Sequence, residues 1–402
     1  MTSYDALVIS SLPIFDQMVD FDPARDFSTF LKGIPAKWVV YLLTDAADRP
    51  VQLLCVKNLR YSLERRLDPT PTEERTKRVD YRDLVRRIHW RRVDSAFEAD
   101  FIYWAIARAL FPQSYRGMMV HRPAWFIHVD PSAEFPRFVQ TTDLSTKSEG
   151  LLIGPVEDKH VAQRLIQSAE DAFDLCRYYN VLTAAPAGKA CAYKEMGRCP
   201  APCDGTVSMD HYRQQVTIAT QAIIDPSHAL RDQTARMKQA AAELKFKLAG
   251  RIKSRIDQIT SFATGPFRHA RPIADFQFCS LQRGPRPGTA KLFLITPAGV
   301  EEIAGLIAEP RSASDLLRFL LAVAAESSAV LDATATERIG LVSHHLFLPK
   351  QTQGLFLRIS EITGDSLAQA YRDLKRQKEP EVTEASEGVI REANATLPPA
   401  VS

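Results

Sequence analysis

The chain has 402 residues, of which 45% are hydrophobic and 25% charged, a composition that excludes a largely disordered or fibrous protein. This length is enough for two or three domains. The net charge is only +3, so any nucleic-acid surface has to be local. No apolar run reaches the ~20 residues of a membrane span. The first residues lack the basic start of a signal peptide, so we expect a cytoplasmic protein with no membrane partner.

Residues 36–118 have the pattern of a small α/β module in β-β-α-β-α order. The expected elements are strands over 38–43 and 51–56, a helix over 58–67, a polar loop over 68–80 and a strand within 82–93. Ser95 followed three residues later by Glu98 is a capping box, which predicts that the last helix begins there. Phe97, Phe101 and Trp104 then recur on one helical face.

The rest of the chain predicts a mixed α/β, multidomain protein. Short strands are expected at WFIHV and FVQTT, and GLLIGPV is expected to be a turn running into an amphipathic helix. Helices follow over 207–224 and 230–259, the second being either a helical hairpin or one helix interrupted at Gly250. From 273 we expect a strand hairpin around GPRPG, a helix, and two strands at GLVSHHLFL and GLFLRI.

Two motifs in this last part have simple interpretations. GPRPG lacks the following helix and the Lys-Ser/Thr pair of a phosphate-binding loop, so it predicts a plain turn. His344 and His345 are expected to be a strand pair with one ring inward, because no third metal ligand is near in sequence. The predicted units are an extension (1–35), the module (36–118), a cysteine-containing segment (119–225), a helical region (226–262), a second α/β domain (270–375) and a disordered tail (376–402).

Four of the six cysteines are concentrated in one short segment. Cys176, Cys191, Cys199 and Cys203 have the spacing C-x14-C-x7-C-x3-C. A reducing compartment disfavours two disulfides, whereas soft thiolates suit an iron–sulfur cluster or tetrahedral zinc. The spacing does not choose between the two metals. Cys55 and Cys279 each lie in an apolar strand-like run and are expected to be free buried thiols.

The cysteine segment carries a resemblance to a known family. CAYKEMGRCPAPCDG followed by VSMDHYRQQV resembles the corresponding segment of the UvrC excinuclease family and of its shorter relative Cho, and the upstream LIGPV is similar to the family's F-G-P element. The helical stretch around Met237, Ala241, Leu244 and Phe246 resembles the UVR motif, with Lys247 where the family has an acidic residue. The resemblance covers about 35–260, and nothing after 270 resembles the family's second nuclease.

This resemblance implies a cofactor and partners. The four clustered cysteines would ligate a [4Fe–4S] cluster, with a structural zinc ion or plain thiols as the alternatives. The chain would act in nucleotide excision repair, bind DNA, and contact a UvrB-like repair protein through the UVR-like helices. A plain helical hairpin packed on its own chain is the alternative for those helices.

The resemblance places residues 36–115 where the family has its GIY-YIG nuclease module. Tyr41 retains the first motif tyrosine, and Asp100 stands at the position of the glutamate that binds Mg or Mn. Gln52-Leu53-Leu54 replaces the second motif, and Ser62 stands where the catalytic arginine belongs. Because losing one charge-stabilising group costs ~10²–10³ in rate, we expect a degraded nuclease. An active endonuclease using Tyr41 and Asp100 is the alternative.

Residues 57–92 carry twelve cations and six acids, a local charge of +6. Tyr61, Tyr81 and Trp90 are interleaved with them, as in surfaces that track a phosphate backbone. The residues expected to bind DNA are Lys57, Arg60, Arg65, Arg66, Arg86, Arg87, Arg91 and Arg92. The alternative is a solvated face, and a third hypothesis is a metal-cluster scaffold that does not bind DNA.

Overall fold

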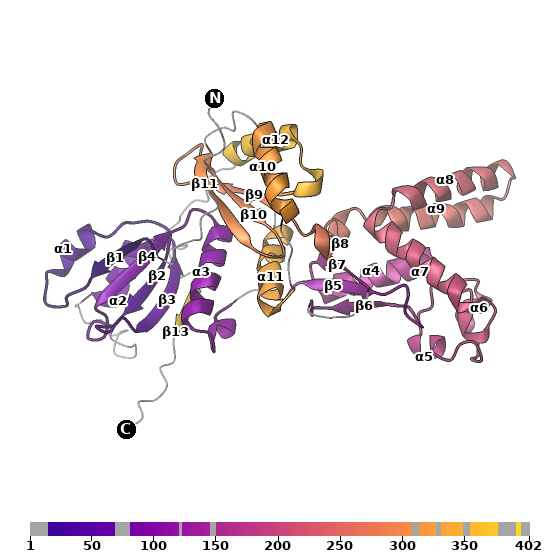
Figure 1. The fold of residues 1–402 in the computed structure, drawn as a ribbon, viewed down its shortest axis with the longest axis horizontal. Helices are drawn as coiled ribbons and strands as arrows, with labels where there is room; N and C mark the ends of the chain where they lie inside the picture. Colours follow the sequence, from indigo (N-terminus) through magenta and orange to yellow (C-terminus); the bar gives the residue numbers. More distant parts are fainter. Residues whose placement is uncertain are drawn as a thin grey trace, which may run out of the picture.

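The computed structural model describes residues 15–68, 81–119, 123–144, 150–307, 313–326, 331–348, 354–376 and 391–394. Within these ranges the chain builds one five-stranded and two four-stranded antiparallel sheets, each accompanied by helices (Figure 1). The predicted mixed α/β, multidomain class is confirmed.

The N-terminal module is a sheet with strand order β1-β4-β2-β3-β13. Its elements are β1 (Gln17–Asp20), α1 (Phe27–Lys32), β2 (Val39–Thr44), β3 (Pro50–Val56), α2 (Leu59–Leu67), β4 (Arg87–Arg92), α3 (Ala96–Leu110) and the distant β13 (Arg391–Asn394). The predicted β-β-α-β-α order is present from β2 to α3. The Asn58 side chain caps α2 and the Ser95 side chain caps α3. Most of the predicted 68–80 loop lies outside the described residues.

Two strands that we did not expect complete this sheet. β1, within the predicted extension, pairs with β4, and β13 pairs with β3. We predicted a disordered tail from 376, and Arg391–Asn394 depart from that prediction; the other residues of the tail beyond Arg376 lie outside the described residues. β3 would otherwise be an edge strand with unpaired backbone groups, which favours the addition of a strand there.

The middle unit is a sheet with strand order β6-β5-β7-β8, covered on one face by helices. Its elements are β5 (Trp125–Val129), β6 (Phe138–Thr141), β7 (Leu151–Val156), α4 (Lys159–Ala172), α7 (Met209–Ile224) and β8 (Arg271–Pro272). The prediction of a turn at GLLIGPV is wrong, because these residues form β7. Gly154 packs under the Phe126 ring of β5, where a Cβ would lie 2.5 Å from Cδ1. This glycine therefore serves close strand packing and not a turn.

The helical region is a hairpin that projects from the middle unit (Figure 1). α8 (Ser227–Ala242) and α9 (Phe246–Ser261) run against each other, which confirms the hairpin alternative. The chain reverses at Leu244, which has a φ of 56°, whereas Gly250 lies inside α9. The tip exposes Leu244, Phe246 and Leu248.

The C-terminal unit is a sheet with strand order β11-β10-β9-β12. Its elements are β9 (Phe278–Arg283), β10 (Ala290–Ile295), β11 (Val300–Ile307), α10 (Ala313–Glu326), α11 (Ala333–Phe347), β12 (Leu355–Arg358) and α12 (Gly364–Arg376). The prediction of a strand at GLVSHHLFL is wrong, because these residues belong to α11. Leu341, Val342, His345 and Leu346 are buried at helical spacing, and a short apolar run does not distinguish a strand from a buried helix. His345 is buried and His344 exposed, as predicted, but on a helix.

Helix α3 lies between two sheets. Ten of its fifteen residues are buried. Its apolar side chains share one core with Val40 and Leu42 of the module, with Phe293 of the C-terminal sheet, and with α11. Figure 1 shows the C-terminal unit between the N-terminal module and the middle unit. The Phe97 ring stands edge-on to the rings of Phe293 and Phe356 at centroid distances of 5.5 and 5.3 Å.

Because this core spans both units, we expect Phe97→Ala to lower the free energy of unfolding by about 3–5 kcal/mol, the usual cost of truncating a buried aromatic ring. Phe246→Ala removes the same atoms from a side chain that is 68% exposed and should change it by less than ~0.5 kcal/mol. Urea unfolding followed by tryptophan fluorescence measures both variants. A similar loss in the two variants would show that α3 is not the shared core.

Candidate functional site

The four clustered cysteines lie in one lobe that connects α4 to α7. The lobe contains α5 (Tyr179–Leu182), α6 (Ala192–Glu195) and the 3₁₀ helix η4 (Pro202–Asp204). The buried Tyr212 of α7 accepts a hydrogen bond from the Cys176 N–H at 3.1 Å. The Gly188 N–H donates to the Cys203 carbonyl at 2.8 Å. The first bond fastens the start of the cysteine segment to α7, and the second ties two parts of the lobe to each other.

The thiols influence one another electrostatically. Interaction between the thiols of Cys176 and Cys199 raises the pKa of Cys176 and lowers that of Cys199. The Arg177 guanidinium also lowers the pKa of Cys199. Burial raises the pKa of Cys203, which also interacts with Cys199 and Cys191. One sulfur of the group is thus biased toward the thiolate, the form that binds metal ions.

The four cysteines are donors of the kind that iron–sulfur clusters and zinc take, but they do not converge on one point. All four are free thiols within electrostatic reach of at least one other member of the set. Within the described residues, which include all four, no three metal-binding side chains come together as a coordination shell. The donor chemistry therefore suits an iron–sulfur cluster or zinc, while closure around an ion would require the lobe to tighten.

Tyr41 and Asp100 lie on opposite sides of the module's sheet. On β2, Val39, Tyr41 and Leu43 pack toward α2, while Val40 and Leu42 pack toward α3. Tyr41 is fully buried, and its hydroxyl shares a hydrogen bond of 2.8 Å with Ser62, the residue at the position of the family's arginine. The structure therefore does not bring the two predicted catalytic residues together.

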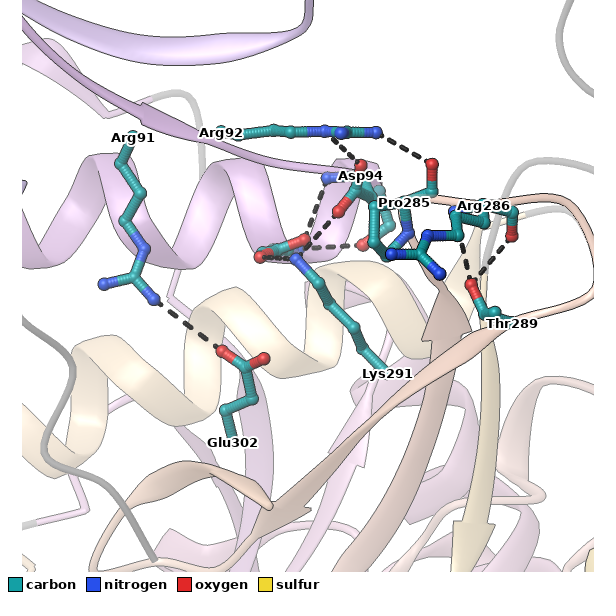
Figure 2. Close-up of polar contacts among 10 residues, drawn as sticks. Arg91, Arg92, Asp94, Pro285, Arg286, Thr289, Lys291 and Glu302 are labelled. Carbon is teal, nitrogen blue, oxygen red and sulfur yellow. Dashed lines mark hydrogen bonds and ion pairs between the residues drawn. The ribbon is translucent and has the colours of Figure 1, made fainter. Parts of the chain in front are cut away.

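The acidic residues at the start of α3 are bound by the C-terminal unit. The Asp100 carboxylate lies 3.0 Å from Nε2 of the buried His345 on α11. Lys291 reaches from β10 toward Asp94 at 2.8 Å, as Figure 2 shows, and toward Glu98 at 2.5 Å. Ser95 caps the Glu98 N–H as predicted, but the Glu98 carboxylate accepts from the Asp94 N–H and not from Ser95.

The arginines of β4 that were predicted to bind DNA make contacts within the chain. Arg91 pairs with Glu302 at 3.7 Å, and Arg92 donates to Asp94 and to the Pro285 carbonyl, both at 2.9 Å (Figure 2). Arg91 and Arg92 therefore join the module to the C-terminal unit.

The other two predicted arginines of this region make contacts within the module. Arg87 pairs with Asp20 and Asp48, and Arg86 donates to the carbonyls of Arg82 and Val85.

The predicted cations on and before α2 are placed differently. Arg60 donates to the Ile34 carbonyl at 2.8 Å, and Arg66 donates to Gln52 at 3.3 Å. Arg65 lies over the Tyr61 ring. Lys57 is half-buried, whereas Arg60 and Arg65 are exposed. A phosphate-binding surface on this module remains a prediction, and Arg60 and Arg65 are its most accessible members.

The sequence analysis did not identify the residues of the C-terminal unit that contact the charged side chains of α3 and β4. Lys291 alternates with Leu292, so it shares the face of β10 that carries Phe293 and Ile295 toward α3. A lysine at an inward position of the run AKLFLI was a visible signal for a buried carboxylate partner. His345 and Glu302 had no such signal, because their partners lie about two hundred residues away in the chain. Cys55 and Cys279 are buried, as predicted, and neither forms a disulfide.

Comparison with known proteins places the cysteine lobe within a recognised domain. Residues 124–222 match the family described as UvrC/Cho excinuclease, middle domain. The predicted resemblance is confirmed for this part of the chain. The match runs from β5 to the end of α7 and includes all four clustered cysteines.

Several curated relatives carry the name UvrABC system protein C. The protein of Campylobacter jejuni subsp. doylei is 28% identical over 157 residues, which are 39% of this chain and 25% of that protein. The Nautilia profundicola protein is 30% identical over 137 residues, covering 34% and 21%. The Helicobacter hepaticus protein is 23% identical over 236 residues, covering 57% and 37%. The chain therefore aligns with between a fifth and two fifths of these relatives' length.

No solved structure matches the chain significantly. The comparisons thus support the UvrC-like middle domain without adding a structural relative for the other units. In the described part of the chain, no helix has both the length and the apolar character needed to cross a bilayer.

The buried Glu98 predicts a pH effect on stability. Burial raises its pKa from 4.5 to about 6, against the opposing influence of Lys291. A raised carboxyl pKa makes the folded state bind the proton more tightly, so the free energy of unfolding falls as the pH rises from 4.5 to 6. The shift corresponds to about 2 kcal/mol.

Urea unfolding of the wild type and of Glu98→Gln across this window measures the effect. Between pH 4.5 and 6, the wild type should lose about 1 kcal/mol of this relative to Glu98→Gln. Glu195→Gln, at an exposed carboxylate, is the control for removing one negative charge. A constant difference between wild type and Glu98→Gln would contradict the raised pKa of Glu98.

Proposed function

We propose that this chain is a nucleotide-excision-repair-related protein of the UvrC type that binds DNA and a repair partner without incising DNA at its N-terminal module. The match of residues 124–222 to the UvrC/Cho middle domain carries the proposal. The relatives that share this region are UvrABC system proteins. DNA binding and partner binding are inferred for this chain from that similarity.

The absence of incision is inferred from the module's chemistry. Metal-assisted phosphodiester hydrolysis needs a carboxylate that can hold the ion and an open position for water. Tyr41 is sealed in the core, and Asp100 is engaged by His345. Ser62 stands at the position of the family's arginine, so a cation for the developing charge is also missing there.

The test is a combined binding and incision assay on duplex DNA carrying a bulky lesion, with Mg²⁺ or Mn²⁺. We expect binding that weakens steeply with salt and no strand cleavage, since contacts to phosphates release counterions. Cleavage of the same duplex by a restriction enzyme controls for its integrity. Incision that is lost in Asp100→Ala would establish the active-endonuclease alternative, and no binding at low salt would favour a scaffold protein.

We propose that Cys176, Cys191, Cys199 and Cys203 hold a [4Fe–4S] cluster. A bound cluster would stabilise the lobe between α4 and α7 by linking its distant segments. The electrostatic interaction of the Cys176 and Cys199 thiols, and of Cys203 with Cys199 and Cys191, supports the nearness of these side chains.

Anaerobic purification followed by visible absorption and by iron and zinc analysis tests this proposal. Cys199→Ala should lose the metal, because it removes one of the four proposed thiolate ligands, whereas Cys55→Ala removes a buried thiol outside the lobe and should retain it. Zinc without iron would assign a structural zinc site. Neither metal in the wild-type protein would leave plain thiols.

We further propose that the α8–α9 hairpin contacts a UvrB-like repair protein. Its tip exposes Leu244, Phe246 and Leu248. Exposed apolar side chains grouped on a helical hairpin are typical of helix-mediated association. Lys247, next to Phe246, gives this surface a positive charge where the family has an acidic residue, so the partner surface would differ in charge.

A further inference from the structure

A small cationic cavity lies where the β9–β10 turn meets the C-terminal end of α12. Its volume is about 120 Å³, and Arg283, Arg286 and Lys375 line it. Thr289 and Tyr371 contribute hydroxyl-bearing side chains to the wall, and no carboxylate belongs to the lining among the described residues. The GPRPG motif, which we interpreted as a plain turn, therefore forms one wall of a basic pocket.

The turn is held rigidly against α12. The Thr289 hydroxyl accepts from the Arg286 N–H at 3.2 Å and donates to the Arg286 carbonyl at 2.7 Å (Figure 2). The Tyr371 hydroxyl donates to the Gly288 carbonyl. Gly288 has a φ of +77°, and a Cβ there would lie 3.9 Å from Cε of Lys375. The fold thus brings Arg286 and Lys375 together from positions 89 residues apart.

A second unit also fixes this turn. Arg92 of the N-terminal module donates to the Pro285 carbonyl at 2.9 Å, next to Arg286 (Figure 2). The turn is therefore anchored on one side by α12 and on the other by β4. A rigid backbone lets Arg286 meet a ligand with little loss of conformational entropy.

Two of the charges at this cavity, those of Arg286 and Lys375, are not balanced by a carboxylate among the described residues. Arg286 and Lys375 are exposed, and in the described part of the chain neither side chain has an ion pair or hydrogen-bond partner. Like charges that converge repel one another unless an anion lies between them. Arg372 and Arg376 continue the positive charge along the neighbouring flank of α12, at a spacing of one helical turn.

The cavity's size and surroundings indicate one kind of anion. A volume of about 120 Å³ is well below the ~300–1,000 Å³ of pockets that enclose whole small molecules, so it suits a single tetrahedral group. The cations on α12 extend beyond it, which suits a ligand with further negative charges along a line. A polynucleotide backbone has this repeating charge.

We propose that this cavity binds one phosphate of a DNA backbone, with Arg286 and Lys375 as its ligands. This inference rests on the proposed function and locates one DNA contact on the C-terminal unit, beyond the region that matches the family. The contact touches no base edge, so it adds affinity and orientation without sequence preference. Arg286 can donate two N–H groups to one phosphate, whereas Lys375 supplies a point charge.

The test is fluorescence anisotropy of a short labelled duplex over a series of salt concentrations. The double variant Arg286→Gln/Lys375→Gln should bind about tenfold more weakly than wild type at low salt. The slope of log affinity against log salt should fall in magnitude by about 1, since one phosphate contact is lost. Lys159→Gln/Arg164→Gln removes the same charges from exposed positions on α4 and should bind within about twofold of wild type.

The outcomes separate this inference from the proposed function. If wild type binds DNA and the two double variants bind alike, the cavity is not a phosphate site, although the proposed function stands. If wild type does not bind DNA at low salt, both fail. Binding of phosphatidylglycerol vesicles that depends on Arg286 and Lys375, with DNA binding unaffected, would overturn the DNA assignment in favour of a lipid headgroup. Thermal unfolding of each variant confirms that it is folded.

Discussion

Helix α3 is buried between two sheets, and this burial governs how the N-terminal module and the C-terminal unit are joined. A helix covered on both sides has to hide its polar side chains as well as its apolar ones. Asp94 and Glu98 lie near its N-terminus, where the helix dipole favours negative charge, yet burial penalises that charge. Lys291 of the C-terminal unit pairs with both carboxylates, and His345 lies against Asp100, further along the helix. The two units are therefore held together by charge pairing as well as by apolar packing.

This arrangement redistributes the residues that carry chemistry. The Asp100 carboxylate, which the resemblance placed at a metal-binding position, contacts the His345 imidazole. Arg91 and Arg92, which were predicted to bind DNA, contact the C-terminal unit. In the described part of the chain, accessible surfaces include the exposed Arg60 and Arg65 of α2, the thiol lobe, the hairpin tip and the cavity beside α12. The N-terminal module, which has the predicted β-β-α-β-α order, therefore uses Asp100, Arg91 and Arg92 to contact the C-terminal unit.

Local sequence patterns predicted much of the secondary structure and the cysteine lobe. The strands of the module, the Asn58 and Ser95 caps and the clustered cysteines all depend on neighbours within a few residues. The two wrong assignments fell where local signals are ambiguous. GLLIGPV contains turn-forming residues that serve cross-strand packing against Phe126, and GLVSHHLFL is an apolar run that fits either a strand or a buried helix.

The sequence alone identified the candidate functional residues: the four clustered cysteines, the basic stretch and the UvrC-like middle segment. The tertiary structure determines which of these residues are accessible, because accessibility depends on how distant segments pack. Tyr41 faces the side of the sheet opposite to Asp100, because side chains alternate along a strand. The spacing of these residues in the sequence does not show whether they share a site. Arg286 and Lys375 come together because α12 packs over the β9–β10 hairpin, and contacts between distant segments arise from packing of the whole core.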